Sequence, residues 1–172
     1  MKVKIYDVNN KIGIEAKIIE LKDYKGNLPS LTDNWRFNFK KHSKVKNTKT
    51  YVLVRENDEE VPEGCLIFEM RDKVEPFMAY VEIAPHNKGK DGQFDKVAGC
   101  LIAFACRLSF KLGEDDYKGW LSFEVWEPTK EEADKLMGLY SKKYKAMRIQ
   151  GTNMMIIAPQ DGEELIEFYL NS

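Results

Sequence analysis

The chain has 172 residues, 43% of them hydrophobic, which is enough for one domain with a sizeable core. Its formal net charge of -1 produces no global field that would attract nucleic acid or an anionic membrane. No apolar run has the length needed to span a bilayer, and the first residues lack the pattern of a signal peptide. We therefore expect a single domain over residues 1–172, with neither a membrane nor a nucleic acid as partner.

The cysteines and histidines indicate the compartment and argue against a metal site. The three cysteines, Cys65, Cys100 and Cys106, are an odd number, and two of them lie inside an apolar segment. Free thiols in a reducing cytoplasm fit this pattern better than disulfides do. The two histidines are far apart in sequence, and the spacing from Cys100 to Cys106 is not that of a zinc site. We expect a cytoplasmic protein without a metal.

The first half of the chain is expected to be mostly strands. Residues 2–8 alternate between apolar and polar, as a strand does. Residues 11–24 fit both a strand and a helix, and we favour a helix there; residues 35–44 predict a second, short helix. Three runs with high strand propensity, joined by short polar connections, then predict an antiparallel meander: residues 50–55, 64–71 and 77–84.

The second half alternates between helices and strands. Apolar residues from Val97 to Leu112 have helical spacing, and Gly113 is a typical helix stop. A strand at 119–125 is followed by Thr129 and Glu132, a capping box that predicts the start of a helix running to Tyr144. A strand at 154–158 and a helix at 163–170 complete the chain. The order of elements indicates an α+β, or mixed α/β, domain.

The segment between the meander and the first long helix suggests a binding site. The sequence "YVEIAPHNKGKDGQFDKVAGCLIAFACRLSF", residues 80–110, passes from an apolar run through a loop rich in glycine and lysine into a helix with many small residues. The first N–H groups of a helix are unpaired and attract anions, and glycines allow a ligand to approach the backbone closely. On the residues alone, a phosphate site and an ordinary surface connection both stay open.

The order of elements from Thr50 to Ala158 resembles that of the GCN5-related N-acetyltransferases, the GNAT superfamily. In that family a loop and a helix after the meander hold the pyrophosphate of CoA through backbone amides. The next strand splays away and leaves a gap for the pantetheine arm. The resemblance implies a central, mostly antiparallel sheet of about six to seven strands flanked by helices.

Two registers connect this loop with the family pattern of Gln or Arg, two residues, Gly, one residue, then Gly or Ala. Gln93 and Ala98 match its ends, with Lys96 in place of the central glycine, while the segment 85–90 matches the family's proline, basic residue and glycine. Combining both registers, the resemblance implies CoA contacts from Ile83, Ala84, Lys88, Gly89, Lys90, Gly92, Gln93, Lys96, Val97 and Ala98. Asp95 could compete with the phosphates for the same N–H groups.

The resemblance also suggests residues for catalysis. Many family members use a tyrosine near the end of the helix after the splayed strand to protonate the departing thiolate, and Tyr140 matches it. Tyr140 could instead belong only to the apolar face of its helix, and Tyr144 is the second choice. Glu82, on the strand that enters the loop, is the candidate general base, although its side chain could point away from the substrate.

The function implied is an enzyme that moves an acetyl group from acetyl-CoA to a primary amine of a small molecule or of a protein lysine. The alternative is a GNAT-like binding or protein-interaction module without catalysis; a homodimer is left open. The segment "WRFNFKKHSKVK", residues 35–46, has the aromatic and basic composition of a nucleic-acid surface. Since Trp35 and Phe39 are four residues apart, we instead expect an amphipathic helix with its lysines in water.

Overall fold

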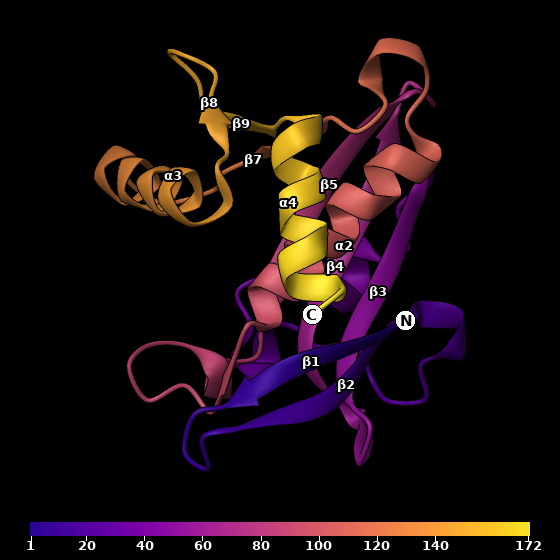
Figure 1. Ribbon diagram of the computed structural model, residues 1–172, viewed down its shortest axis with the longest axis vertical. Coiled ribbons are helices and arrows are strands. Elements are labelled where there is room, and N and C mark those ends of the chain that lie inside the picture. Colours follow the sequence, from indigo (N-terminus) through magenta and orange to yellow (C-terminus); the bar gives the residue numbers. More distant parts are fainter.

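The computed structural model describes residues 1–172 and contains one nine-stranded sheet in the order β6-β1-β2-β3-β4-β5-β7-β9-β8 (Figure 1). All neighbouring strands are antiparallel except β5 and β7, which are parallel. The strands are β1 (Lys2–Asp7), β2 (Ile12–Glu20), β3 (Thr48–Arg55), β4 (Asp58–Arg71), β5 (Glu75–Ile83), β6 (Phe94–Asp95), β7 (Leu121–Glu124), β8 (Met147–Arg148) and β9 (Met154–Ile157). The six to seven strands expected correspond to the seven longer ones, and the two-residue strands β6 and β8 are additional.

Four α-helices accompany the sheet: α1 (Phe39–His42), α2 (Val97–Leu112), α3 (Lys130–Tyr144) and α4 (Pro159–Leu170). The mixed α+β fold class is thus confirmed, as are the strands of the meander and the bounds of α2. The predicted helix start at Thr129 is also confirmed, because its hydroxyl accepts a hydrogen bond from the Glu132 N–H at 3.2 Å, although the Glu132 carboxylate contacts the Thr129 hydroxyl and not the Thr129 N–H that a full capping box requires. Short 3-10 helices lie at Leu21–Asp23, Leu31–Asp33, Pro85–Asn87 and Asp115–Tyr117.

The prediction of a helix over residues 11–24, which we favoured, is wrong. Residues 12–20 form β2, which pairs with β1 on one side and β3 on the other, and only residues 21–23 are helical. The alternating pattern prevails because it buries Ala16 and Ile18 on the core face of the sheet. A helix at this place would leave the facing edges of β1 and β3 without a partner.

The helix predicted over residues 35–44 is real but much shorter, because α1 covers only four residues. The N–H groups of Arg36 and Phe37 donate to the carboxylate of Glu82, which keeps this part of the chain extended. The helix begins after Asn38, whose side chain accepts from the Lys41 N–H. As the amphipathic pattern predicted, Trp35 and Phe39 are buried and the lysines are exposed.

The sheet has a helical layer on each face. Helices α2 and α4 lie together across one face (Figure 1), and their apolar side chains form the larger core with residues such as Leu66 and Phe68. The opposite face carries a smaller core around Trp35 and Phe39. Close contact between α2 and α4 depends on Gly99, where an added Cβ would lie 2.1 Å from the ring of Tyr169.

All three cysteines are free and buried. Burial raises the pKa of the Cys100 and Cys106 thiols to about 12, so these side chains act as small apolar packing groups. None of the four helices has the length and apolar character required to cross a membrane.

Candidate active site between β5 and β7

The central strands β5 and β7 run side by side for only a short distance. They pair at Phe77 with Ser122 and at Met78 with Phe123, and then they separate. The register between β4 and β5 shifts at this place, and Ala79 is the extra residue of the resulting bulge. Beyond Met78 the edge of β5 has no partner strand, so every second residue directs its backbone N–H and C=O groups into a gap.

This gap is a hollow whose walls come from both faces of the sheet. Apolar and aromatic side chains make up most of its lining, which consists of Arg36, Phe37, Met78, Ala79, Tyr80, Val81, Phe123, Glu124, Val125, Trp126, Leu136 and Tyr140. Arg36 crosses from the segment before α1 to the chain after β7, where its guanidinium donates to the Glu127 carboxylate at 2.6 Å and to the Trp126 carbonyl. The hollow is therefore bounded on the α1 side by an ion pair.

Tyr140 reaches the gap from α3. Its ring packs edge-on against Phe123 with a centroid separation of 5.2 Å, and its hydroxyl has no hydrogen-bond partner within the chain. Burial raises the pKa of the phenol, while the guanidinium of Arg36 acts in the opposite direction. The phenol is thus protonated at neutral pH, as a proton donor must be. Tyr144, the second choice, is buried against Tyr140 and Tyr169 and does not line the hollow.

The first turn of α2 starts from an unusual residue. Lys96, the N-cap, has φ 69° and ψ 0°, the left-handed conformation that glycine adopts most easily, and no side chain caps the helix. The family pattern has a glycine here in the register from Gln93 to Ala98, so the backbone supports that register. Asp95 accepts only from the Lys96 N–H, at 2.7 Å. The next N–H groups, of Val97 and Ala98, receive no side-chain cap.

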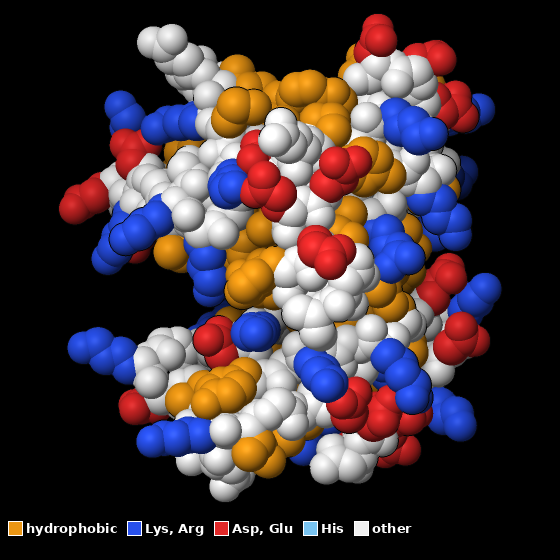
Figure 2. Space-filling view, in the orientation of Figure 1, with side chains coloured by type: hydrophobic (Ala, Val, Ile, Leu, Met, Phe, Trp, Pro, Cys, Tyr) orange, Lys and Arg blue, Asp and Glu red, His pale blue; other side chains and the backbone are white.

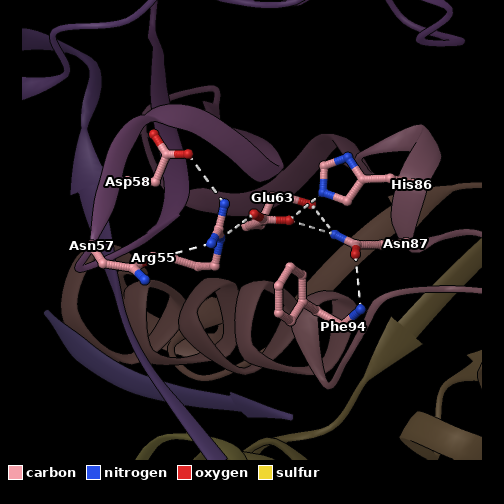
Figure 3. Close-up of polar contacts among 7 residues, drawn as sticks. All are labelled: Arg55, Asn57, Asp58, Glu63, His86, Asn87 and Phe94. Atoms are coloured by element: carbon pink, nitrogen blue, oxygen red, sulfur yellow. Dashed lines mark hydrogen bonds and ion pairs between the residues drawn. The ribbon is translucent and has the colours of Figure 1, made fainter. Parts of the chain in front are cut away.

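The loop before α2 is fastened to the sheet, and the organising residue is Glu63 of β4, which is fully buried (Figure 3). Its carboxylate accepts from Arg55 Nε at 2.8 Å and from Asn87 Nδ2 at 2.9 Å, and it contacts His86 Nε2. Asn87 Oδ1 in turn accepts from the Phe94 N–H at 3.0 Å. The start of the loop is thus attached to Glu63 directly, and the end of the loop is attached to Asn87, which Glu63 holds in place.

Several predicted CoA contacts are not available as backbone donors for this reason. The N–H of Ala84 donates to the Glu63 carbonyl, that of Gln93 to the His86 carbonyl, and that of Gly92 to the Gly89 carbonyl. Ile83 pairs with Gly64 within the sheet, and the ammonium group of Lys88 contacts Glu82. Gly89 and Lys90 lie in the surface turn. Of the predicted set, Val97 and Ala98 remain as backbone donors at the open start of α2, while the Lys96 N–H is taken by Asp95.

Glu82 lies on the α1 face of β5 and is almost fully buried. Its Oε2 accepts from the Arg36 N–H at 2.8 Å and its Oε1 from the Phe37 N–H at 2.9 Å, and Lys88 contacts the same carboxylate. Both oxygens therefore already serve to hold the segment before α1 on the sheet. The Glu82 carboxylate thus stabilises the fold, and it does not line the hollow where a general base would act.

A second hollow opens on the α1 face and meets the first one. It is lined by His42, Val45, Thr48, Ile67, Glu69, Arg71, Phe77, Ala79, Tyr80, Glu124 and Trp126. The residues that line both hollows are Ala79, Tyr80, Glu124 and Trp126. Sequence reasoning missed Arg36, Glu124 and Trp126, because they follow no motif and only the separation of the strands brings them together. The one feature of the sequence that could have indicated a place in the site is that Glu124 and Trp126 lie at the end of the strand after α2.

The molecular surface is also hollowed on the side where α2 begins. Figure 2 shows a notch at the left edge of the molecule, with several basic side chains around it. In the same orientation, α3 lies above the notch and the loop before α2 lies below it (Figure 1). A ligand that entered here would meet α3, the loop and the start of α2.

No protein-family model and no curated protein matches the sequence. Solved structures do match its fold over most of its length. The KacTA–DNA complex has a TM-score of 0.60 and 13% identity, covering 89% of this chain and 99% of that chain. AtaTR bound with acetyl-CoA has a TM-score of 0.56 and 16% identity, covering 88% and 98%. AtaT complexed with acetyl-methionyl-tRNA has a TM-score of 0.53 and 14% identity, covering 88% and 99%.

KacT and AtaT have the GNAT fold. The agreement in fold with them confirms the GNAT-like architecture inferred from the order of elements. At these low identities the likeness concerns the fold, with β5 and β7 as its splayed strands and α2 as its helix after the loop.

The comparisons correct the view that a nucleic acid is not to be expected as a partner. Proteins with the same fold, matched over nearly their whole length, are found in complexes with DNA and with an acetylated methionyl-tRNA. That expectation was wrong in physical terms because it used only the net charge of the whole chain to exclude nucleic-acid binding. A net charge near zero still allows local basic surfaces, such as the exposed Lys40, Lys41 and Lys44 around α1.

Proposed function

We propose that this chain is an N-acyltransferase that moves the acetyl group of acetyl-CoA to a primary amine. The observation that carries the proposal is the separation of β5 and β7 over a hollow that contains the unpartnered hydroxyl of Tyr140. A protein of the same fold, AtaTR, binds acetyl-CoA, which supports this thioester as the cosubstrate.

The cosubstrate would lie along β5. The thioester and the pantetheine arm occupy the gap beyond Met78, and the pyrophosphate binds at the first turn of α2, on the N–H groups of Val97 and Ala98. From Ala79 to Ile83, which precedes the loop, the strand advances four residues, or about 13 Å at about 3.3 Å per residue. This is the scale of an extended pantetheine arm, so one molecule can reach both places.

The chemistry requires little from side chains. The neutral amine nitrogen attacks the thioester carbonyl carbon, the new C–N bond forms, the C–S bond breaks, and the nitrogen loses a proton to water. Backbone N–H groups on the open edge of β5 would polarise the carbonyl oxygen. The Tyr140 hydroxyl gives its proton to the departing thiolate and is protonated again from solvent. The nearby guanidinium of Arg36 would stabilise the transient phenolate.

The two hollows would keep the substrates apart until they react. The thioester enters from the side of α2 and α3, and the acceptor enters from the α1 face, so they meet where the hollows share Ala79, Tyr80, Glu124 and Trp126. The acceptor is an amine of a small molecule, a protein or an aminoacyl-tRNA. The last belongs in any test panel because AtaT is seen with an acetylated methionyl-tRNA.

Thiol release from acetyl-CoA in the presence of such a panel tests the proposed reaction. Replacing Tyr140→Phe removes only the hydroxyl, so turnover should fall by roughly 100-fold, the usual contribution of a general acid, with CoA affinity unchanged. The matched control is Tyr144→Phe on the same helix, which should retain turnover.

Two other results would contradict the proposal. Equal turnover in the Tyr140→Phe variant and the unaltered protein would remove the phenol from the mechanism. CoA binding without thiol release for any amine of the panel would favour the alternative function, a GNAT-like binding module without catalysis.

A further inference from the structure

The hollow on the α1 face contains one charged side chain that no other group neutralises. Glu124, the last residue of β7, is half-buried, and its carboxylate makes no hydrogen bond or ion pair within the chain. It stands where this hollow meets the gap between β5 and β7. A partly desolvated carboxylate without a partner is unfavourable, and a bound cation would relieve that cost.

The other ionisable groups around it already have partners. Arg36 is paired with Glu127 at 2.6 Å, and Arg71 lies 3.9 Å from Glu69 while its guanidinium stacks on Phe77 at 3.3 Å. The imidazole of His42 stacks on the ring of Tyr80 at 4.3 Å. Burial, together with Lys41, lowers the pKa of His42, so this ring is neutral at neutral pH. The net charge left over beside the reaction centre is thus the negative charge of Glu124.

The surroundings of Glu124 fit a particular kind of cation. Trp126 is 56% exposed, so an aromatic face beside the carboxylate is open to a ligand. A carboxylate next to an open indole face favours an ammonium group through ionic and cation–π attraction. The rest of the hollow is apolar where Val45, Ile67 and Phe77 line it, which suits an aliphatic chain.

We propose that Glu124 and Trp126 bind the acceptor as an alkylammonium ion, with its aliphatic chain lying along the hollow on the α1 face; the bound ammonium gives one proton to water before its neutral nitrogen attacks the thioester. This inference rests on the proposed function, because it names the acceptor class of the same site. It also gives the acceptor-side carboxylate a position different from Glu82, whose oxygens are already engaged. Either an alkyl diamine or a lysine side chain supplies such a group.

Binding can be measured without catalysis through the indole N–H signals of the three tryptophans in ¹⁵N NMR spectra. The Trp126 signal is assigned with a Trp126→Phe variant. Titration with cadaverine, or with Nα-acetyl-lysine methylamide, should shift the Trp126 signal saturably, and the tighter of the two identifies a free diamine or a peptide lysine as the source. 1-Pentanol, which has a similar chain but no charge, should leave the signal in place.

The Glu124→Gln variant keeps the shape of the side chain and removes its charge, so it should weaken ammonium binding at least tenfold. Glu114→Gln changes an exposed glutamate elsewhere and should have no effect on binding. No Trp126 shift with either amine, or an equal shift in the Glu124→Gln variant, would overturn the inference. These titrations contain no CoA, so a failure of CoA to bind refutes the proposed function separately. If the protein acetylates amines but the Trp126 signal does not shift, the ammonium site at Glu124 is refuted and the proposed function is not.

Discussion

Lys96 occupies a backbone position that an L-amino acid adopts at a cost. Its φ of 69° is left-handed, and such a conformation costs roughly 1–2 kcal/mol for a residue with a Cβ. The position begins the helix that carries the proposed phosphate donors, and the Lys96 ammonium lies 5.3 Å from the ring centroid of Phe168. A lysine here adds a positive charge at the start of α2, where glycine would only relieve the backbone.

This interpretation predicts the stability of two variants that differ by one methyl group. Both Lys96→Gly and Lys96→Ala remove the ammonium, but only glycine relaxes the left-handed conformation. Glycine also makes the unfolded chain more flexible, which lowers the free energy of unfolding. With both effects counted, the free energy of unfolding should be about 0.5–1 kcal/mol larger for the glycine variant than for the alanine variant. Urea unfolding measures the difference.

A matched pair at Lys118 provides the control, because this exposed lysine has φ -61°. There the order should reverse, with alanine more stable than glycine. If Lys96→Ala were as stable as Lys96→Gly, the left-handed conformation at the start of α2 would be contradicted.

Individual residues of the site were predictable only where a pattern fixes them. Tyr140 follows from the capped helix after the splayed strand, and the structure places its ring in the gap. Whether Glu82 faces a substrate or its own backbone depends on the segment 35–37, which lies 45 residues away along the chain. Glu124 could not be recognised at all, because its importance lies in the lack of a partner, and no sequence pattern records that.

At the scale of elements, the loop between β5 and α2 is held by one buried carboxylate. Glu63 connects β4 with His86 and Asn87, and Asn87 then binds the end of the loop at Phe94 (Figure 3). The composition of this loop, rich in glycine and lysine, left both a phosphate site and an ordinary surface connection open. Its hydrogen bonds make it an ordered connection that positions the first turn of α2.

Replacing Glu63→Gln should therefore loosen the loop and destabilise the fold. The amide keeps the shape but cannot neutralise Arg55, so we expect a loss of about 2–3 kcal/mol in the free energy of unfolding. Hydrogen exchange should become faster at the amides of Ala84, Gln93 and Phe94, whose bonds depend on this cluster.

Glu59→Gln serves as the control because Glu59 belongs to the same strand but is partly exposed and pairs with Lys17 at the surface. That change should cost no more than about 0.5 kcal/mol. Equal losses in the two variants would show that the buried carboxylate does not organise the loop.

Element types were predictable where the periodicity was long and the termini carried clear signals. Helix α2 has sixteen residues at helical spacing, and α3 begins after the N-cap residue Thr129, so both followed from the sequence. The segment of β2 was predicted as a helix because its alternation of apolar and polar residues is imperfect. Its hydrogen bonds to β1 and β3 make it a strand, and the residues of the segment itself do not reveal this pairing. The two-residue strands β6 and β8 are too short to leave any pattern.

At the scale of the whole molecule, the sheet is continuous except where β5 and β7 separate. This opening divides the molecule into a side with α2 and α3 and a side with α1, and hollows from the two sides meet at it. AtaTR bound with acetyl-CoA shares the overall fold, at 16% identity. What the opening binds depends on side chains that differ among proteins of one fold, which here are those of Glu124 and Trp126.

The central claim is that this opening and the start of α2 bind acetyl-CoA, and thermal unfolding with and without CoA tests it most directly. At a concentration 100 times its dissociation constant, a ligand stabilises the folded state by about 2.7 kcal/mol. For a domain of this size the melting temperature should rise by about 5–10 °C. Pantetheine, which lacks the phosphates that α2 would bind, should produce a smaller rise at equal concentration. An unchanged melting temperature in millimolar CoA would contradict the account.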